Sequence, residues 1–464
     1  MPPEKCAYAL ARYSRSPDSI RNSIEWVRTH DSQKFLESFY FKYGHGSIAD
    51  LGHLVLCFEG VSEIAATEIE DEQLWDGQAR SSRYQDFSRA NTVAPPELDR
   101  AQVAVYRDAS AKLMEAYKRI HALVFDHLSE LLPKPEEMKP EAYRRTVAAR
   151  AFDSARYLLP FGVPTGVGQV TSIRTLERQI RRLKASPYAE LREIAEEMTA
   201  ACAAEPGCAW AGSASEPVAP TLARYVNADA HAAQAFADVA LWAKQNLPAR
   251  PAMSMTEHVD LLRPDNVVSD IAATLLYQVT DWPYRDLYTL TRGWSEAQRR
   301  EVLDTALRSR TKHDDLLRAF RGAPYVFDMA IDIGAWRDLH RHRRCQQYRQ
   351  AYTTALGYET PPAIEAAGIA DDYHAAITEA YEASQSLSSP AADYMLPFAT
   401  RSRFLFKMDF AEAEYISRLR SGVKGHFSYR GIAWEMREKM VALEPELGPL
   451  IDATPPWIED PLRR

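Results

Sequence analysis

The architecture of this chain follows from the stretch Ser154-Ala155-Arg156-Tyr157-Leu158-Leu159-Pro160-Phe161, because its pattern returns later as Ala391-Ala392-Asp393-Tyr394-Met395-Leu396-Pro397-Phe398. The two prolines are 397 − 160 = 237 positions apart. A second pair of windows, 190–198 and 428–436, agrees at Arg, Ile, Ala, Glu and Met, with a shift of 436 − 198 = 238. Nearly equal shifts in two separate windows indicate a tandem internal repeat.

The repeat predicts two domains, residues 1–225 and 226–464. A seam is expected near residues 203–253, where five prolines interrupt Ala-rich helical sequence. Amphipathic patterns predict helices over 175–198 and 411–420, and the apolar run 51–58 predicts a strand. The fold class is therefore expected to be α+β. Residues 93–140 carry a helical pattern at 101–132 flanked by prolines, which is typical of an insertion.

Composition restricts the function classes. A chain of 464 residues with 46% hydrophobic content can bury a large core. The net charge of −8 argues against a general nucleic-acid binder. Five scattered cysteines without a CxxC pair favour neither a disulfide framework nor a zinc site, and we expect no metal. No apolar segment is long enough to span a membrane, and no secretory signal is apparent, so we expect a soluble cytoplasmic protein.

A dense basic segment is the first candidate for a binding site. It runs from Arg337 to Arg349 and contains Arg341-His342-Arg343. Guanidinium groups bind phosphate through paired hydrogen bonds, so the segment predicts an anion site. Taken alone, such a cluster is more often a solvated helix face.

Several short motifs resemble the flavin-dependent thymidylate synthase family, whose hallmark is RHR, seven residues, then S-x-R. The matching segments are Gly44-His45-Gly46-Ser47, Phe58-Glu59-Gly60-Val61-Ser62, Ser81-Ser82-Arg83-Tyr84, Arg341-His342-Arg343 and Leu419-Arg420-Ser421. The departures are complementary. The place of RHR before Ser81 holds Asp71-Glu72-Gln73, and the place of S-x-R after Arg341 holds Ala351-Tyr352-Thr353. Each repeat lacks the motif that the other keeps.

The resemblance implies a fold and an assembly. Each repeat would be an antiparallel sheet flanked by helices, and the two repeats would form a pseudo-dimer. Family sites form at subunit junctions, so RHR of one repeat and S-x-R of the other would complete one site per chain. The reciprocal site, with Glu70, Asp71 and Glu72 in place of cations, would repel an anion. Two chains would supply four repeats, which makes a homodimer the expected state.

The resemblance also implies a reaction, in which a methylene passes from methylenetetrahydrofolate through FAD to C5 of dUMP while NADPH supplies the hydride. Arg341, His342 and Arg343 are the catalytic candidates. Ser81, Arg83, Arg337 and Arg420 are expected to bind the nucleotide. If its segment is extended, Ser81 would share a face with Arg83. FAD is expected to contact His342, Arg343, Ser47, Ser172, Arg174 and Arg178.

Other interpretations remain open at this point. UMP or another pyrimidine nucleotide could replace dUMP, and the product could be methylated or hydroxymethylated. Since neither repeat carries an uninterrupted family motif, the chain could instead be an inactive nucleotide- or flavin-binding protein with a regulatory or structural role. An RNA-binding module using the basic segment and its tyrosines is the third hypothesis, which the acidic net charge disfavours.

Overall fold

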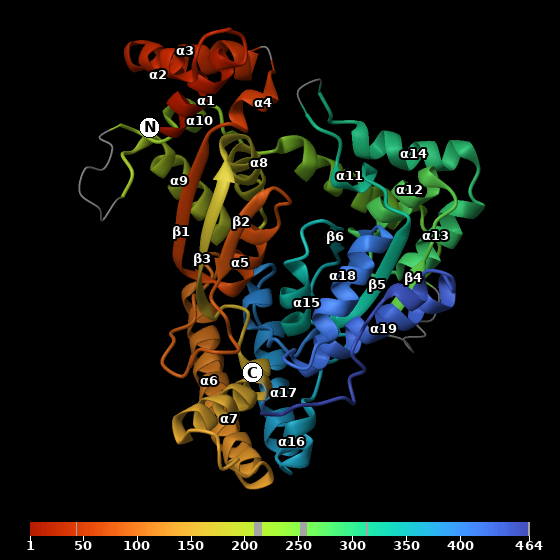
Figure 1. Cartoon of the computed structure of the whole chain (residues 1–464). Helices are drawn as coiled ribbons and strands as arrows, with labels where there is room; N and C mark the ends of the chain where they lie inside the picture. Colours follow the sequence, from red (N-terminus) through yellow and green to blue (C-terminus); the bar gives the residue numbers. More distant parts are fainter. Residues whose placement is uncertain (43, 208–215, 251–257, 312–313, 463–464) are drawn as a thin grey trace. The chain divides into compact units, whose positions relative to one another are not determined.

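The computed structural model describes residues 1–42, 44–207, 216–250, 258–311 and 314–462 (Figure 1). These residues form two compact units, which are described separately. The first unit comprises Met1–Arg80, Pro95–Glu97 and Pro164–Ala230. The second comprises Ser81–Ala94, Leu98–Val163 and His231–Arg464. The units thus divide the chain differently from a single cut near residue 225, and parts of the expected seam, 208–215 and 251–253, lie outside the described residues.

The first unit contains a three-stranded antiparallel sheet in the order β1-β3-β2 (Figure 1). Its strands are β1 (His53–Ser62), β2 (Trp75–Ala79) and β3 (Pro164–Ser172). His53 pairs with Ser172 on one side of β3, and Trp75 pairs with Thr171 on the other. The β1–β3 register shifts between Glu59 and Val61, at Gly60, whose φ of 69° suits a glycine. The predicted strand 51–58 is therefore confirmed, with later bounds.

The helices of the first unit are mostly short. They are α1 (Pro3–Tyr13), α2 (Ile20–Thr29), α3 (Ser32–Leu36), the π-helix η1 (Glu37–Lys42), α4 (Gly46–Ala49), α5 (Glu63–Glu70), α8 (Ile173–Lys184), α9 (Ala189–Ala203) and α10 (Pro220–Ala223). The single helical pattern expected over 175–198 is two helices, α8 and α9. Pro187 lies between them, and proline disfavours a helical conformation in the residue before it.

The second unit contains a four-stranded antiparallel sheet in the order β4-β5-β7-β6. The strands are β4 (Val259–Leu262), β5 (Tyr325–Asp332), β6 (Gln346–Arg349) and β7 (Arg401–Met408). Every residue of β5 is buried, as are all but the first of β7, so these two central strands belong to the core. Another part of the core lies where α12 (Val267–Tyr277), α13 (Tyr284–Gly293) and α14 (Glu296–Leu307) pack. It includes Leu275, Leu276, Leu287, Val326 and Leu405.

The second unit is richer in helices. They are α6 (Arg100–Leu131), α7 (Pro140–Ala155), α11 (Ala230–Asn246), α12 (Val267–Tyr277), α13 (Tyr284–Gly293), α14 (Glu296–Leu307), α15 (Ile333–His340), α16 (Pro362–Ala366), α17 (Ala370–Gln385), α18 (Phe410–Ser421) and α19 (Phe427–Leu443). Short 3₁₀ turns are η2 (Arg156–Leu158), η3 (Arg318–Phe320), η4 (Ala391–Met395) and η5 (Gly448–Leu450). The predicted helices 101–132 and 411–420 are confirmed as α6 and α18. Helices and antiparallel sheets together confirm the α+β class.

The two units share one succession of elements. The first runs β1, α5, β2, then β3, α8, α9, and the second runs β5, α15, β6, then β7, α18, α19. In both sheets the third of these strands pairs between the first two, as β1-β3-β2 and β5-β7-β6. Helices α5 and α15 are each eight residues long, and the last residue of the preceding strand, Ser62 or Asp332, caps each N-terminus.

The two copies of the repeated octapeptide pair with each other inside the second unit. Phe161 N donates to Leu396 O at 2.9 Å, and Phe398 N donates to Leu159 O at 3.0 Å. Pro160 and Pro397 form an antiparallel bridge. Interchanging the copies leaves this pattern unchanged, so a local two-fold relates them.

One buried hydrogen bond between a hydroxyl and a carboxylate recurs in both units. The residue at the end of the strand supplies the hydroxyl in the first unit and the carboxylate in the second. In the first unit the Ser62 hydroxyl donates to the Glu190 carboxylate at 2.5 Å. In the second unit the Ser428 hydroxyl, on the corresponding α19, donates to the Asp332 carboxylate. Each contact holds the start of one helix against another, and a buried acid accepts hydrogen bonds in both cases.

In the part of the chain that the structure describes, no helix is both long enough and apolar enough to cross a membrane.

Glycine 162 offers a test of the packing around the paired octapeptides. A Cβ at this position would lie 2.0 Å from the Tyr106 hydroxyl and 3.1 Å from the Val93 carbonyl oxygen. We expect Gly162→Ala to lower the free energy of unfolding by about 1–3 kcal/mol, because packed backbone cannot move freely. Chemical denaturation measures the change.

Gly431→Ala is the matched control. A Cβ there, within α19, meets nothing within 4 Å. The substitution should raise the free energy of unfolding by about 0.5–1 kcal/mol, because alanine favours helix over glycine. Equal effects of the two substitutions would contradict the packing described.

Candidate functional site

The segment Ser81–Tyr84 enters the second unit as a turn, not as an extended strand. The Ser81 hydroxyl accepts a hydrogen bond from the Arg83 backbone N at 3.3 Å. The segment is therefore not extended, and the condition under which Ser81 would share a face with Arg83 is not met. The reason is local, since serine hydroxyls compete with strand pairing by bonding backbone groups two residues on. Ser82 and Arg83 are both buried.

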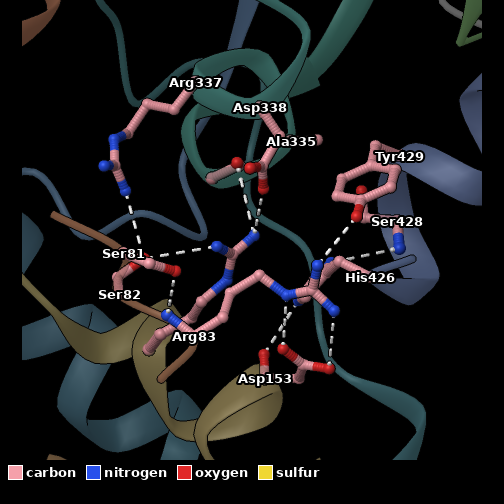
Figure 2. A network of polar contacts seen from close by, with 12 residues as sticks. Ser81, Ser82, Arg83, Asp153, Ala335, Arg337, Asp338, His426, Ser428 and Tyr429 are labelled. Carbon is pink, nitrogen blue, oxygen red and sulfur yellow. Dashed lines mark hydrogen bonds and ion pairs between the residues drawn. The ribbon is translucent and has the colours of Figure 1, made fainter. Parts of the chain in front are cut away.

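Four polar contacts fix the guanidinium of Arg83, and Figure 2 shows its contacts with Asp153 and Tyr429. Its Nε donates to Asp153 Oδ1 at 2.8 Å, and Nη2 donates to Asp153 Oδ2 at 3.3 Å. Nη1 donates to the Tyr429 hydroxyl at 2.8 Å, and Nη2 also donates to the Lys424 carbonyl at 3.1 Å. The Arg83–Asp153 pair is nearly closed to solvent. Arg83 therefore stands in one orientation and has one remaining N–H, on Nη1.

His426 supports the carboxylate side of this pair (Figure 2). Its Nδ1 accepts from Ser428 N at 3.3 Å, so the other ring nitrogen, Nε2, carries the hydrogen that reaches the Asp153 carbonyl at 2.9 Å. Burial, reinforced by nearby Arg156 and Arg83, lowers the pKa of His426 well below its ordinary value. His426 is therefore a neutral local hydrogen-bond partner.

Arg156 is a second buried guanidinium in the same cluster, and sequence reasoning did not assign it a role. Its Nη1 donates to the Ser82 hydroxyl at 3.3 Å, and its Nη2 donates to Gly334 O at 3.3 Å and to Asp338 Oδ2 at 3.2 Å. Its Nε is buried without a partner among the described residues. One signal could have found it, because the otherwise similar octapeptides differ here as Arg156 and Asp393.

The Ser82 hydroxyl joins Arg156 to a third arginine. Arg337 Nη1 donates to the same oxygen at 3.2 Å (Figure 2). The Arg337 guanidinium also lies 4.8 Å from the ring centre of Phe398. Burial alone would raise the pKa of the neighbouring Asp338. The surrounding cations, Arg156 foremost, outweigh that effect and hold its pKa below the ordinary value. Asp338 is thus an anion surrounded by arginines.

Arg341-His342-Arg343 forms the turn between α15 and β6. Arg341 caps the C-terminus of α15 and is exposed, whereas His342 is buried. The His342 carbonyl accepts from Cys345 Sγ at 2.8 Å and from Gln347 Nε2 at 2.9 Å. These bonds to the main chain hold the turn, so that its side chains project from a fixed backbone.

Tyr429 connects this turn to the Ser81 segment. Arg420, near the end of α18, donates from Nε to His342 Nε2 at 2.8 Å, and its guanidinium lies 5.7 Å from the Tyr429 ring centre. Arg83 lies 5.6 Å from the same ring. Cations at this range are attracted by the ring. The structure therefore brings Ser81, Arg83, Arg337, His342 and Arg420 together in the second unit.

The remaining predicted residues lie in the first unit. Ser47 is exposed on α4, and the Ser172 hydroxyl caps α8 by accepting from Thr175 N at 3.2 Å. Arg174 and Arg178 follow on that helix, and Arg174 pairs with Asp50 at 3.0 Å. The Arg174 guanidinium passes close to Gly46, where a Cβ would be 3.0 Å from Cζ. Hydroxyls and partly exposed guanidinium groups of this kind suit an anionic dinucleotide such as FAD.

The acidic segment of the first unit has a cationic partner of its own. Asp71 caps the C-terminus of α5, the position that Arg341 takes on α15. Glu72 pairs with Arg182 at 2.9 Å, and Glu68 pairs with the same arginine at 3.4 Å. The expected repulsion of phosphate here stays a prediction. Among the described residues, no group of three or more His, Cys, Asp or Glu side chains could hold a metal ion.

Comparisons with known proteins place these features in context. A family model described as "Thymidylate synthase complementing protein" matches residues 1–205 and 260–446. A "UPF0159 protein" of Chlamydia muridarum is 26% identical over 423 residues, covering 87% of this chain and 77% of that protein. A "Flavin-dependent thymidylate synthase" of Clostridium tetani is 24% identical over 200 residues, covering 42% of this chain and 76% of that enzyme.

Among solved structures, a UMP/dUMP methylase of Streptomyces cacaoi bound with 5-Br UMP aligns with a TM-score of 0.31 and 12% identity. The alignment covers 48% of this chain and 88% of that one.

The Arg83–Asp153 pair generates a stability prediction. Asp153→Ala should lower the free energy of unfolding by about 3–5 kcal/mol, because it leaves a buried guanidinium without its carboxylate. Asp304→Ala removes the carboxylate of an exposed pair with Arg300 and should change the same quantity by less than about 1 kcal/mol. Urea denaturation of both variants measures the two free energies of unfolding. An effect of Asp153→Ala as small as that of Asp304→Ala would contradict the buried ion pair.

Proposed function

Because this chain belongs to the thymidylate synthase complementing protein family, we propose that it methylates C5 of a uridine nucleotide, most simply dUMP. Methylenetetrahydrofolate would be the carbon donor and NADPH the reductant. The observation that carries the proposal is the pair of cations near Tyr429. Arg83 of the S-x-R turn lies 5.6 Å from its ring centre, and Arg420, bonded to His342 of the RHR turn, lies 5.7 Å from it. Both family motifs thus reach one buried ring.

We propose further that the chain is a tandem duplication with repeats at 1–225 and 226–464, arranged as a pseudo-dimer. The shared succession of elements and the symmetric pairing of the octapeptides support this. The shift from Ser62 to Asp332, 332 − 62 = 270, also relates the ends of α5 and α15. The same shift carries Asp71 to Arg341 and Arg83 to Thr353. Only one complete set of motifs results, so one site per chain is proposed.

The arginines of the second unit would bind the nucleotide through its phosphate. Arg83 retains one N–H, and the buried Nε of Arg156 has no partner among the described residues, so both can donate to an incoming oxygen. Ser81 and Arg337 lie in the same cluster. Their side chains are already held by protein contacts, so little reorganisation accompanies binding.

Arg341, His342 and Arg343 would act on the pyrimidine and the cofactor. A fixed guanidinium stabilises negative charge as it develops on the pyrimidine oxygens, and Arg420 is held in place for the same task by His342. FAD, when bound, would supply the redox chemistry between NADPH and the one-carbon unit. His342 and Arg343, with Ser47, Ser172, Arg174 and Arg178, are the proposed FAD contacts.

An inactive nucleotide- or flavin-binding protein is the second candidate. The observation that favours it is charge compensation, since Arg83 and Arg156 each already pair with a carboxylate, Asp153 and Asp338. Such a protein would bind nucleotide or FAD without oxidising NADPH or releasing a methylated product. A homodimer, with two chains supplying four repeats, is proposed for either function, and the solution mass of the purified chain tests it.

The flavin content of the purified protein tests the one-site proposal. We expect one FAD per chain, read from the flavin absorbance after denaturation. Two FAD per chain would overturn the single site, and none would overturn the flavoprotein assignment. Arg341→Ala should keep the fold, because the side chain is exposed, and should lower turnover about a hundredfold. Arg300→Ala, an exposed arginine on α14, is the control and should leave turnover unchanged.

Substrate choice is tested by turnover with dUMP, UMP and dCMP side by side, using NADPH oxidation and mass spectrometry of the product. We expect dUMP to be used best, UMP more slowly and dCMP not at all. The product mass separates methylation from hydroxymethylation. Nucleotide binding without product for any of the three would favour the inactive protein.

A further inference from the structure

Glu412 lies on the same helix as Arg420 and on the other side of the His342 imidazole. The two residues are eight positions apart on α18, a little over two helical turns, so they project from one face. Glu412 Oε1 lies 3.4 Å from His342 Nδ1, and Arg420 Nε lies 2.8 Å from His342 Nε2. The side chains of Glu412 and His342 are both buried. An anion and a cation thus flank one imidazole.

The hydrogen bonds determine which nitrogen of His342 carries the hydrogen. The Nε of Arg420 can only donate, so His342 Nε2 must accept. A neutral His342 therefore carries its hydrogen on Nδ1, facing the Glu412 carboxylate. His342 therefore donates from Nδ1 to Glu412 and accepts at Nε2 from Arg420, and both of these partners lie on α18.

Burial of the Glu412 carboxylate is costly unless it is compensated. Among the described residues it forms no ion pair with a lysine or arginine, and the group that faces it is His342 Nδ1. Likewise, no carboxylate of the described residues pairs with Arg420. The opposite charges of α18 therefore act on each other through the imidazole and not by direct contact.

We propose that Glu412 is a positioning residue, which holds His342 in the Nδ1–H tautomer so that Nε2 keeps the Arg420 guanidinium beside Tyr429. The inference rests on the proposed function, in which Arg420 binds the nucleotide. Among the described residues, Glu412 forms no hydrogen bond or ion pair with Arg420 or Tyr429, so its effect on the ligand passes through His342.

The hydrogen bond between Arg420 and His342 depends on pH, because it requires a neutral imidazole. Protonated His342 would present Nε2–H to the Nε–H of Arg420, and two donors repel. The groups that face the ring are Glu412, Arg420 and Tyr415 of α18, with Cys345 and Gln347 bonded to its carbonyl. Burial lowers the pKa of His342 and outweighs the Glu412 hydrogen bond, which raises it. Arg420 is therefore held at neutral pH and released as pH falls through the His342 pKa.

The test measures dUMP and UMP affinity by calorimetry on the full chain. Glu412→Gln should weaken binding about tenfold, because glutamine can donate as well as accept and no longer selects one tautomer. Glu414→Gln is the matched control, since Glu414 is on the same helix and pairs with Arg418 at the surface. Its affinity should stay within about twofold of the parent.

A double-mutant cycle separates positioning from general destabilisation. In an Arg420→Lys background, Glu412→Gln should cost less than about twofold, because the group that it positions has already been replaced. Equal tenfold losses in both backgrounds would show that Glu412 acts on something other than Arg420, and the inference would fail.

Nitrogen-15 NMR of histidine reads the tautomer without any ligand, with the His342 signal identified by its loss in His342→Gln. We expect hydrogen on Nδ1 in the parent and a mixed tautomer in Glu412→Gln. Hydrogen on Nε2 in the parent would overturn the inference. If the parent shows the expected tautomer but binds neither nucleotide, the proposed function fails while the positioning of Arg420 stands.

Discussion

The ion pair between Arg83 and Asp153 ties together segments that are distant in the sequence. Arg83 belongs to a turn after β2, Asp153 belongs to α7, and the remaining partners of Arg83 come from Lys424 and from Tyr429 of α19. A buried guanidinium needs such a set of acceptors, because desolvation of an unpaired charge costs several kcal/mol. Once these bonds form, the turn can adopt one orientation, and Ser82 is carried to Arg156 and Arg337.

The same pairs explain how an acidic protein keeps a concentrated group of arginines. Like charges at short range repel, and the carboxylates Asp153 and Asp338 offset that repulsion inside the cluster. The Tyr429 ring centre lies 5.6 Å from Arg83 and 5.7 Å from Arg420, and the ring attracts both cations. In the first unit the signs are reversed, because the cation Arg182 offsets the repulsion between the carboxylates Glu68 and Glu72. Local ion pairs thus compensate the arginine cluster of the second unit and the acidic segment of the first.

Regular elements with strong local patterns were predictable. Helices α6 and α18 follow from amphipathic spacing, and family membership follows from short motifs. The break between α8 and α9 was missed, although Pro187 signals it. The turn at Ser81 was missed because strand and turn are close in energy for a segment with two serines, and tertiary contacts of Arg83 select the turn.

From the sequence alone came the similar windows 154–161 and 391–398, the separate positions of RHR and S-x-R, and the acidic residues Asp71 and Glu72, because these are patterns of residue type and spacing. Only the folded chain shows which arginines are paired, that Arg156 joins them, and that Glu412 and Arg420 flank His342. The physical reason is that burial, hydrogen-bond direction and charge compensation depend on residues up to 346 positions apart. No local pattern encodes those distances.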